Sequence, residues 1–460
     1  MELGVGGSNP PCCTKIMSKE KNLKPSKELP LGFVDRQEKE LLIRDFIISN
    51  IKEVMNKYGF QYLETPSFEY TDSIGKFLPD KERPDQGVFS FKDENKWLSL
   101  RYDLTAPLAR YVAKNYLEIP KPFKRYQLGT VWRNEKPGPG RFREFLQFDA
   151  DYVGTKSLQA DAELCVLISE ILEKCGLDKK GYTVKISSRK FTDKLFEQLK
   201  IKSKEQISTT LRALDKIDRL GWVEAKKLLG EGRKDKSGDY TKGANLNNDQ
   251  IKIIENALKS KTSDSEDVLE IIKTFKDYNF ENYKFDPSVI RGLEYYTGPI
   301  FEVNLNFEVK NLKGQAIQFG SIGGGGRYDN LVSNFGNFDC PATGISIGLD
   351  RLVFALMQKK DFKIKTTRPV VICVFDQNKN KEYVGILNKL RMSNISSEIY
   401  SGEGKLKKQM EYANKIGSPA VILYGDDEMK SGKATLKNLE SGKESSVKTE
   451  DLANEIKKLL

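Results

Sequence analysis

Apolar positions follow a helical period near the start of the chain and then switch to alternation. From Asp35 to Tyr58 apolar residues recur every three or four positions, and Gly59 follows them. This spacing predicts a long amphipathic helix that ends at the glycine. Phe60 to Pro66 alternates like a short strand that the proline closes. A helix followed by a strand is therefore expected to open the folded part of the chain.

Strand-like runs dominate from Trp97 to Tyr152. They flank a Gly/Pro turn at Lys136–Gly140, which predicts a hairpin with a long tip. Neighbouring strands joined by a hairpin pair antiparallel, so antiparallel sheet is expected here rather than a doubly wound parallel sheet. Leu158 to Cys175 returns to helical spacing, and Ile300–Leu305 is again strand-like, ahead of the glycine run Gly323–Gly326.

Composition divides the rest of the chain into domains. Residues 183–285 are more charged, have helical apolar spacing and contain a Gly-rich break, which predicts a helical module inserted between residues 30–182 and 286–362. Regular alternation of apolar strands and helices predicts a separate α/β domain at 368–460. Residues 1–29 hold Gly, Pro, Ser and Lys, and we expect them to be a disordered extension.

Composition also limits the chemistry. The 460 residues include no histidine, which excludes Ser-His-Asp and Cys-His nucleophiles and mixed Cys/His zinc sites. The net charge of +11 is compatible with a polyanionic partner and equally with lysine-rich solvated faces. Six scattered cysteines without a CxxC pair favour a reducing, cytoplasmic location, and no apolar run approaches the length of a membrane span.

Three clusters carry candidate chemistry. Arginines flank the Gly/Pro loop in Arg133–Glu135 and Arg141–Phe145, an arrangement that suits a polyphosphate or a salt-bridged exposed hairpin. Arg291–Gly298 sets two tyrosines beside an arginine, and Gly323–Asp329 has more glycine than a flexible loop needs. The glycine run lacks the pattern of a Walker loop or a dinucleotide site.

In order, these segments resemble histidyl-tRNA synthetases, a family of class II aminoacyl-tRNA synthetases, from about Gly32 to the C-terminus. The first helix with Tyr62–Pro66 is similar to motif 1 of that class, Val131–Glu135 through Phe145 to motif 2, and Gly344–Arg351 to motif 3. Arg291–Tyr296 and Gly324–Asp329 resemble the two signatures of the histidine-specific family. Synthetases for proline or threonine, and synthetase-like regulatory subunits without the signatures and the anticodon domain, are the alternatives.

The resemblance implies an α+β fold: a class II catalytic core of antiparallel sheet flanked by helices, the helical insertion, and a C-terminal α/β anticodon-binding domain. It implies that histidine and ATP form histidyl-adenylate and pyrophosphate, and that histidine then passes to the 3′ end of its tRNA. Mg²⁺ is the expected cofactor, held mostly by phosphate and water with a few carboxylates, and no individual residue is assigned to it. The partners are tRNA(His), L-histidine and, from motif 1, a second copy in a homodimer.

Roles for single residues follow from the same resemblance. Arg133, Arg351 and Arg291 are the catalytic candidates, and Arg291 also contacts the histidine carboxylate. The other histidine-binding candidates are Asp103, Thr105, Gln147, Asp151, Tyr295 and Tyr296. The ATP-binding candidates are Arg133, Glu135, Arg141, Phe145 and Arg351. Glu294 stands where many members have aspartate, and the Lys136–Gly140 tip differs from the loop of many bacterial members, so handling of the extra 5′ guanosine of histidine tRNA stays open.

Overall fold

The structure is a computed structural model that describes residues 26–75, 87–234, 238–290, 295–311, 313–317, 319–359, 361–364 and 366–460. The chain forms two compact units, which divide between Phe362 and Lys363. Arg291 and most of the expected N-terminal extension, residues 1–25, lie outside the described residues.

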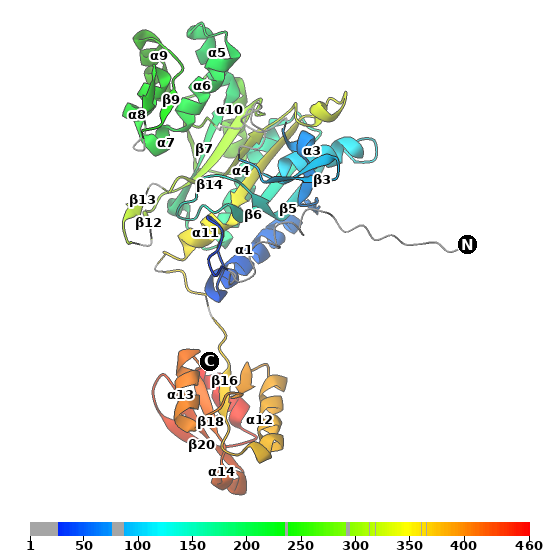
Figure 1. Ribbon diagram of the computed structural model, residues 1–460. Helices are drawn as coiled ribbons and strands as arrows, with labels where there is room; N and C mark the ends of the chain where they lie inside the picture. The colour runs from blue at the N-terminus through cyan, green and yellow to red at the C-terminus, as the bar shows by residue number, and fades with distance from the viewer. Residues whose placement is uncertain are drawn as a thin grey trace, which may run out of the picture. The chain divides into compact units, whose positions relative to one another are not determined.

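An eight-stranded sheet forms the centre of the first unit (Figure 1). In sheet order its strands are β1 (Gln61–Tyr62), β5 (Phe123–Trp132), β6 (Glu144–Val153), β15 (Ala342–Gly348), β14 (Ser321–Arg327), β11 (Pro299–Leu305), β7 (Tyr182–Ser188) and β10 (Tyr283–Phe285). The outermost pairs, β1 with β5 and β7 with β10, are parallel, and every pair between them is antiparallel. The expected antiparallel core is therefore present.

Three helices cover one face of this sheet: α1 (Glu38–Lys57), α4 (Leu158–Lys174) and α11 (Leu349–Leu356). Buried isoleucines of α1, including Ile43, Ile47 and Ile51, face α4 and α11, as the helical spacing predicts. The helix α3 (Thr105–Lys114) was not expected, because the sequence around it is strand-like. Asp103 starts it, because its Oδ1 accepts hydrogen bonds from the backbone N–H groups of Thr105 (3.1 Å) and Ala106 (3.0 Å).

The segment between β7 and β10 is largely helical. Its helices are α5 (Arg189–Gln198), α6 (Lys204–Asp215), α7 (Ile217–Leu220), α8 (Trp222–Leu229), α9 (Asn248–Leu258) and α10 (Glu266–Asp277). A hairpin, β8 (Gly232–Lys234) with β9 (Tyr240–Lys242), occupies the Gly-rich break, and η1 (Lys179–Gly181) precedes β7. Residues 183–188 and 283–285 belong to strands of the large sheet rather than to the helical group. The domain ranges themselves stay a prediction.

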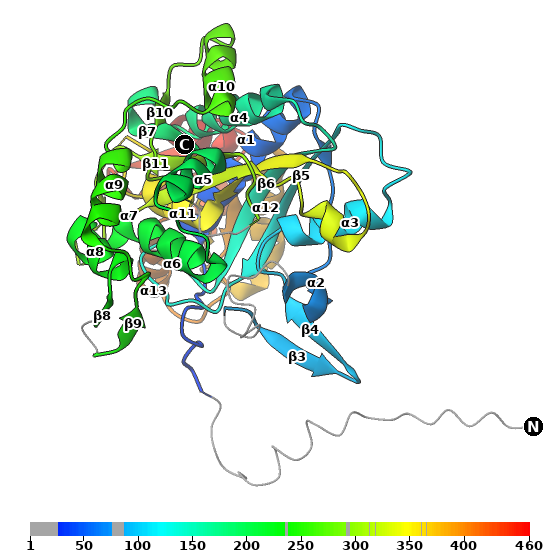
Figure 2. The same cartoon turned by 90° about the horizontal axis from the view of Figure 1, so that it is seen from above.

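A small three-stranded sheet lies at the opposite end of the unit from α5–α9 (Figure 2). It contains β2 (Phe68–Tyr70), β4 (Lys96–Leu100) and β3 (Ser90–Asp93), with α2 (Thr71–Gly75) beside it. The remaining elements of the unit are β12 (Val309–Lys310), β13 (Ala316–Ile317) and η2 (Val332–Phe335). Of the strand expected over Phe60–Pro66, only β1 forms, and it ends before the proline; β2 begins two residues after Pro66.

The second unit is an α/β domain with a five-stranded sheet. Its elements are β16 (Val370–Cys373), η3 (Gln377–Lys379), α12 (Asn380–Met392), β17 (Ser397–Ile399), α13 (Leu406–Lys415), β18 (Ala420–Leu423), α14 (Asp426–Ser431), β19 (Lys433–Asn438), β20 (Glu444–Lys448) and α15 (Leu452–Leu459). β17, β16 and β18 are parallel, whereas β19 and β20 extend the sheet antiparallel. In the described part of both units, no helix combines the length and the apolar character needed to cross a membrane.

Candidate active site

Polar residues alternate along β6 on the sheet face opposite α1, α4 and α11. Gln147, Asp149 and Asp151 are two residues apart, so all three side chains point to the same face. Each is at most 5% exposed. On the neighbouring strand β5, Arg125 is paired with Asp151 and Gln127 with Asp149. The centre of the sheet therefore carries buried polar and charged side chains instead of a continuous apolar surface.

The β6 residues Gln147, Asp149 and Asp151 line a narrow pocket that we call the inner cavity. Its lining consists of Asp103, Thr105, Arg133, Gln147, Asp149, Asp151, Tyr295, Tyr296, Gly324, Gly325, Tyr328, Gly344, Ile345 and Ser346. Glycines make room for it: a Cβ added to Gly344 of β15 would lie 2.0 Å from Oδ1 of Asp151. The cavity therefore depends on the absence of side chains on β14 and β15 as much as on the polar groups that β6 supplies.

Asp151 is held from two neighbouring elements. Its Oδ1 accepts a 2.5 Å hydrogen bond from the hydroxyl of Tyr328, and its Oδ2 lies 3.1 Å from Nη2 of Arg125. That ion pair does not have hydrogen-bond geometry, and Oδ2 has no hydrogen-bond partner among the described residues. An acceptor oxygen buried without a donor is costly, so this atom is suited to receive an N–H group from a ligand.

A hydrogen-bonded chain links the other polar groups. Nε2 of Gln147 donates to Asp149 Oδ1 over 2.7 Å, and the hydroxyl of Thr105 donates to Asp149 Oδ2 over 3.3 Å. Oε1 of Gln147 in turn accepts from Nη2 of Arg133 over 3.2 Å. Asp149 thus orients two residues that were predicted to bind the ligand, although it was not itself predicted.

Burial raises the pKa of the three carboxylates that line the inner cavity, Asp149, Asp151 and Asp103. The pKa of Asp149 is raised to about 7, first by burial and then by the charge of Asp151, while Arg125 acts in the opposite direction. Burial also raises the pKa of Asp151, against the effect of Arg125 and Tyr328. It raises the pKa of Asp103, against two backbone N–H donors and Arg133. Three buried carboxylates and two guanidiniums leave the group one negative charge in excess when all are ionised, which suits a cationic ligand group.

A second pocket of about 170 Å³, the outer cavity, adjoins the first. It is lined by Arg133, Glu135, Gly140, Arg141, Phe142, Phe145, Gln147, Ser321, Ile322, Gly323, Gly324, Ser346, Gly348 and Arg351. Arg133, Gln147, Gly324 and Ser346 line both cavities. Every predicted site residue that the structure describes therefore lines the inner or the outer cavity.

Two arginines of the outer cavity are fixed by aromatic rings and carbonyls. The guanidinium carbon of Arg133 lies 4.5 Å from the ring centre of Tyr102 and 5.1 Å from that of Phe145, and Nε donates to the Tyr102 carbonyl. Arg351 lies 4.2 Å from the ring centre of Phe319 and donates to the carbonyls of Phe319 and Ser321. Such held guanidiniums are preorganised for an anion.

Electrostatics supports an anionic ligand in the outer cavity. The pKa of Arg351 is lowered to about 10, by burial first and then by repulsion from Arg141. A bound polyphosphate would relieve that repulsion. Glu135 is the carboxylate of this lining, and its Oε1 accepts a 2.6 Å hydrogen bond from the hydroxyl of Tyr102.

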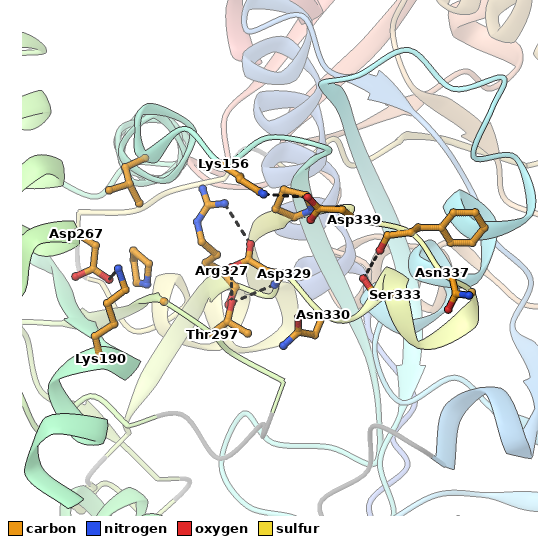
Figure 3. A pocket seen from close by; sticks show the side chains of 16 residues that line it. Lys156, Lys190, Asp267, Thr297, Arg327, Asp329, Asn330, Ser333, Asn337 and Asp339 are labelled. Atoms are coloured by element: carbon orange, nitrogen blue, oxygen red, sulfur yellow. Dashed lines mark hydrogen bonds and ion pairs between the residues drawn. The ribbon is translucent and has the colours of Figure 1, made fainter. Parts of the chain in front are cut away.

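A wider depression of about 660 Å³ lies near α5, α10 and the end of β14 (Figure 3). Its charged side chains pair with one another: Lys156 with Asp339, and Arg327 with Asp329, which also accepts from Thr297. None of the predicted site residues in the described part of the chain lines it. The two smaller cavities therefore hold the candidate chemistry.

The large sheet and the separate α/β unit are those of a class II aminoacyl-tRNA synthetase with an anticodon-binding domain. The histidyl-tRNA synthetase family model matches residues 32–352, and the anticodon binding domain model matches residues 369–459. The chain belongs to the histidyl-tRNA synthetase family, and its activity is that of a histidine–tRNA ligase, which joins histidine to tRNA with the use of ATP.

Similar proteins agree with this assignment over nearly the whole chain. A histidine–tRNA ligase of Bartonella quintana (strain Toulouse) is 44% identical and covers 92% of this chain and 91% of its own length. One of Rhizobium meliloti (strain 1021) is 45% identical, with 94% and 92% covered. The crystal structure of histidyl-tRNA synthetase from Nostoc sp. PCC 7120 superposes with a TM-score of 0.70 at 26% identity and covers 95% of this chain and all of that one.

Three residues that were not predicted from the sequence line the inner cavity or contact its lining: Arg125, Asp149 and Tyr328. Asp149 could have been found, because it lies midway between Gln147 and Asp151 at a strand spacing of two. Arg125 could not, since its contact with Asp151 depends on the register between β5 and β6. Tyr328 lies in the segment Gly324–Asp329, which was recognised from the sequence, but no individual role was predicted for Tyr328.

Proposed function

We propose that the inner cavity binds histidine, that the outer cavity binds ATP, and that adenylation occurs where the two meet. The observation that carries this proposal is their common lining by Arg133 and Gln147. There the carboxylate of histidine would attack the α-phosphorus of ATP. The bond from that phosphorus to the bridging oxygen breaks, and pyrophosphate leaves with its electron pair. No covalent bond to the enzyme is needed, so the absence of histidine from the chain is no obstacle.

Histidine would be held at both ends. Asp103, Thr105 and Gln147 receive its α-ammonium group, whose positive charge compensates the excess negative charge of the buried carboxylates. Asp151 accepts from one imidazole nitrogen and Tyr296 meets the other, while Tyr295 lines the same space. A site of buried polar groups rejects amino acids that leave those groups unpaired, which supplies the selectivity.

ATP would be held by its phosphates and its base. Arg133 and Arg351 bind phosphate oxygens, Arg141 reaches the phosphate tail, Glu135 orients the nucleotide and Phe145 stacks on adenine. Arg291 would contact the histidine carboxylate and the α-phosphate. Its role rests on the sequence resemblance alone, because it lies outside the described residues.

Mg²⁺ fits this site as an ion carried by the nucleotide. Among the described residues there is no group of three or more acidic or cysteine side chains that could hold a metal, and the outer cavity offers the carboxylate of Glu135. Mg²⁺ commonly binds in this way, with substrate phosphates, water and one or two carboxylates as ligands. When bound, it would neutralise phosphate charge. The protein's own contribution is the arginine cluster.

We further propose a homodimer that forms through the small sheet. Phe68, Tyr70 and Phe91 lie on one face of it and are each 45–50% exposed, and the rings of Phe68 and Phe91 meet at 5.5 Å. The opposite face is occupied, since Glu69 pairs with Arg110 of α3. An aromatic face that its own unit leaves uncovered suits a second copy, in accord with the motif 1 resemblance.

The dimer proposal predicts that replacing both Phe68 and Phe91 with glutamate yields a monomer, because four charges would be buried in the twofold interface. Light scattering after gel filtration measures this directly. Tyr240→Glu is the control: Tyr240 is similarly exposed but lies on β9, away from the small sheet. A monomeric wild-type protein, or a double variant that remains dimeric, would contradict the proposal.

The compartment is proposed to be the cytoplasm. Cys165, Cys175, Cys340 and Cys373 are free and buried, as expected under reducing conditions. The anticodon-binding unit and the excess of basic residues fit tRNA as the polyanionic partner.

The activity predicts ATP–pyrophosphate exchange that depends on histidine and on no other amino acid. All twenty amino acids are tested in turn. Proline and threonine are the most informative negative controls, because their synthetases share motifs 1, 2 and 3 of class II. Exchange with either of these, or with none of the twenty, would refute the assignment of the inner cavity to histidine.

A further inference from the structure

Asp151 can accept a hydrogen bond from the imidazole N–H only if its carboxylate is ionised and correctly oriented. Burial opposes this ionisation. Its side chain is 2% exposed, and the carboxylates of Asp149 and Asp103 lie in the same cavity lining. Mutual repulsion among these groups favours uptake of a proton. A protonated Asp151 would carry a donor where an imidazole N–H requires an acceptor. Another group must therefore stabilise the ionised form of Asp151.

Arg125 is placed to do this. It is fully buried, and Nη2 lies 3.1 Å from Asp151 Oδ2. Two hydrogen bonds anchor the same guanidinium: Nη2 also donates to the Leu104 carbonyl over 2.9 Å, and Nη1 donates to Gln127 Oε1 over 3.3 Å. Oε1 of Gln127 also accepts from the hydroxyl of Thr65. The guanidinium is thus fixed before any ligand binds.

Arg125 is absent from the lining of the inner cavity, so it contacts the site through Asp151. A buried arginine contributes little to a sheet that could hold an apolar residue at the same place, because removing its charge from water is costly. The position of Arg125 is explained if its positive charge stabilises the carboxylate of Asp151 beside it. Its charge lowers the pKa of both Asp151 and Asp149.

We propose that Arg125 is the positioning residue for histidine recognition: it keeps Asp151 ionised and turned so that Oδ2 accepts the imidazole N–H. Tyr328 fixes the other oxygen, Oδ1, and so leaves Oδ2 as the reading atom. This inference rests on the proposed binding of histidine in the inner cavity and adds the group that makes Asp151 competent to select it.

The test is the KM for histidine in pyrophosphate exchange, measured against pH for the full-length wild type and for Arg125→Leu. At neutral pH the variant is expected to raise this KM by about 30-fold, the effect of losing one charge-assisted interaction. The KM for ATP should change by less than about twofold, because Arg125 does not line the outer cavity.

The pH dependence separates this role from a structural one. Without the guanidinium the pKa of Asp151 and of Asp149 rises, so the ratio of variant to wild-type KM should be largest near pH 6 and fall as pH increases and the carboxylates ionise. Taking the ratio cancels the titration of histidine itself. The other charged or titratable groups near Asp151 and Asp149 are Asp103 before α3, Arg133 at the end of β5, Tyr328 after β14, Tyr295 and Tyr296, and Arg101 after β4, whose charge interacts with Asp149. All are unchanged in the variant.

Arg125→Lys is the second variant and decides the matter if Arg125→Leu does not fold. It retains a charge without the planar fork, so we expect about a fivefold rise in KM for histidine and a pH profile close to that of the wild type. For either variant, a histidine KM equal to that of the wild type overturns the inference. So does, for Arg125→Leu, a rise that is the same at every pH or is shared by ATP.

Asp151→Asn distinguishes failure of this inference from failure of the proposed function. If Asp151→Asn leaves the KM for histidine unchanged, Asp151 does not read the imidazole and the proposed binding mode itself is wrong. If Asp151→Asn raises this KM and Arg125→Leu does not, histidine binds as proposed and only the role of Arg125 is refuted.

Discussion

Replacing Arg133 with alanine is expected to lower kcat for histidine-dependent pyrophosphate exchange by about 1000-fold, the upper range for removing one preorganised charge from a transition state. Arg133 lines both cavities and is held between the rings of Tyr102 and Phe145, with a hydrogen bond to Gln147. Its guanidinium therefore does not reorganise as charge develops at the α-phosphate. Rapid-quench measurement of adenylate formation at saturating ATP and histidine isolates this step.

Lys136→Ala is the matched control for Arg133. It removes a positive charge three residues further along the same hairpin, but Lys136 is exposed and lines neither cavity. Exchange does not involve tRNA, so this variant should keep wild-type activity in the assay. If Arg133→Ala retained more than about a tenth of the wild-type rate, stabilisation of the transition state by Arg133 would be rejected.

The fold of the catalytic unit was predictable where one pattern ran without interruption. Helical spacing over Asp35–Tyr58 corresponds to α1, and the Gly/Pro tip at Lys136–Gly140 joins β5 to β6. α3 was missed, because its first turn includes Pro107 within strand-like neighbours and its start is set by the side chain of Asp103. β19 and β20 were also missed, since both are largely polar strands.

The candidate site could be assembled from the sequence only through its resemblance to a family. Asp103, Gln147 and Arg351 come from three distant segments, and no spacing in the chain relates them. Strand pairing brings two of them near each other, because Gly348 at the end of β15 is paired with Gln147 on β6 and Arg351 follows Gly348 by three residues; Asp103 joins them from the loop before α3. Arg125 belongs to no recognised motif. Its contact with Asp151 becomes apparent only once the register between β5 and β6 is known.

Replacing Gly344 with alanine is expected to raise the KM for histidine at least about 100-fold, since a displacement of the order of 1 Å at a reacting or recognising group can have an effect of this size. The added Cβ would lie 2.0 Å from Asp151 Oδ1 and 3.3 Å from the carbonyl of Ala150. The strand cannot retreat easily, because Gly344 is paired with Asp151 on β6 on one side and with Gly326 on β14 on the other. The carboxylate must therefore turn away and lose its hydrogen bond from Tyr328.

Gly385→Ala serves as the control, because it adds the same methyl group at a glycine of α12 where nothing lies within 4 Å. It should leave the KM for histidine unchanged and slightly raise the melting temperature, since alanine is the better helix former. Isothermal titration of histidine binding and thermal melting of both variants separate a blocked site from a disrupted sheet. A Gly344→Ala protein that melts like the wild type yet does not bind histidine shows that the glycine keeps space for Asp151. Wild-type affinity in that protein would mean that the carboxylate is not needed in its present position, and the assignment of Asp151 to the imidazole would then have to be abandoned.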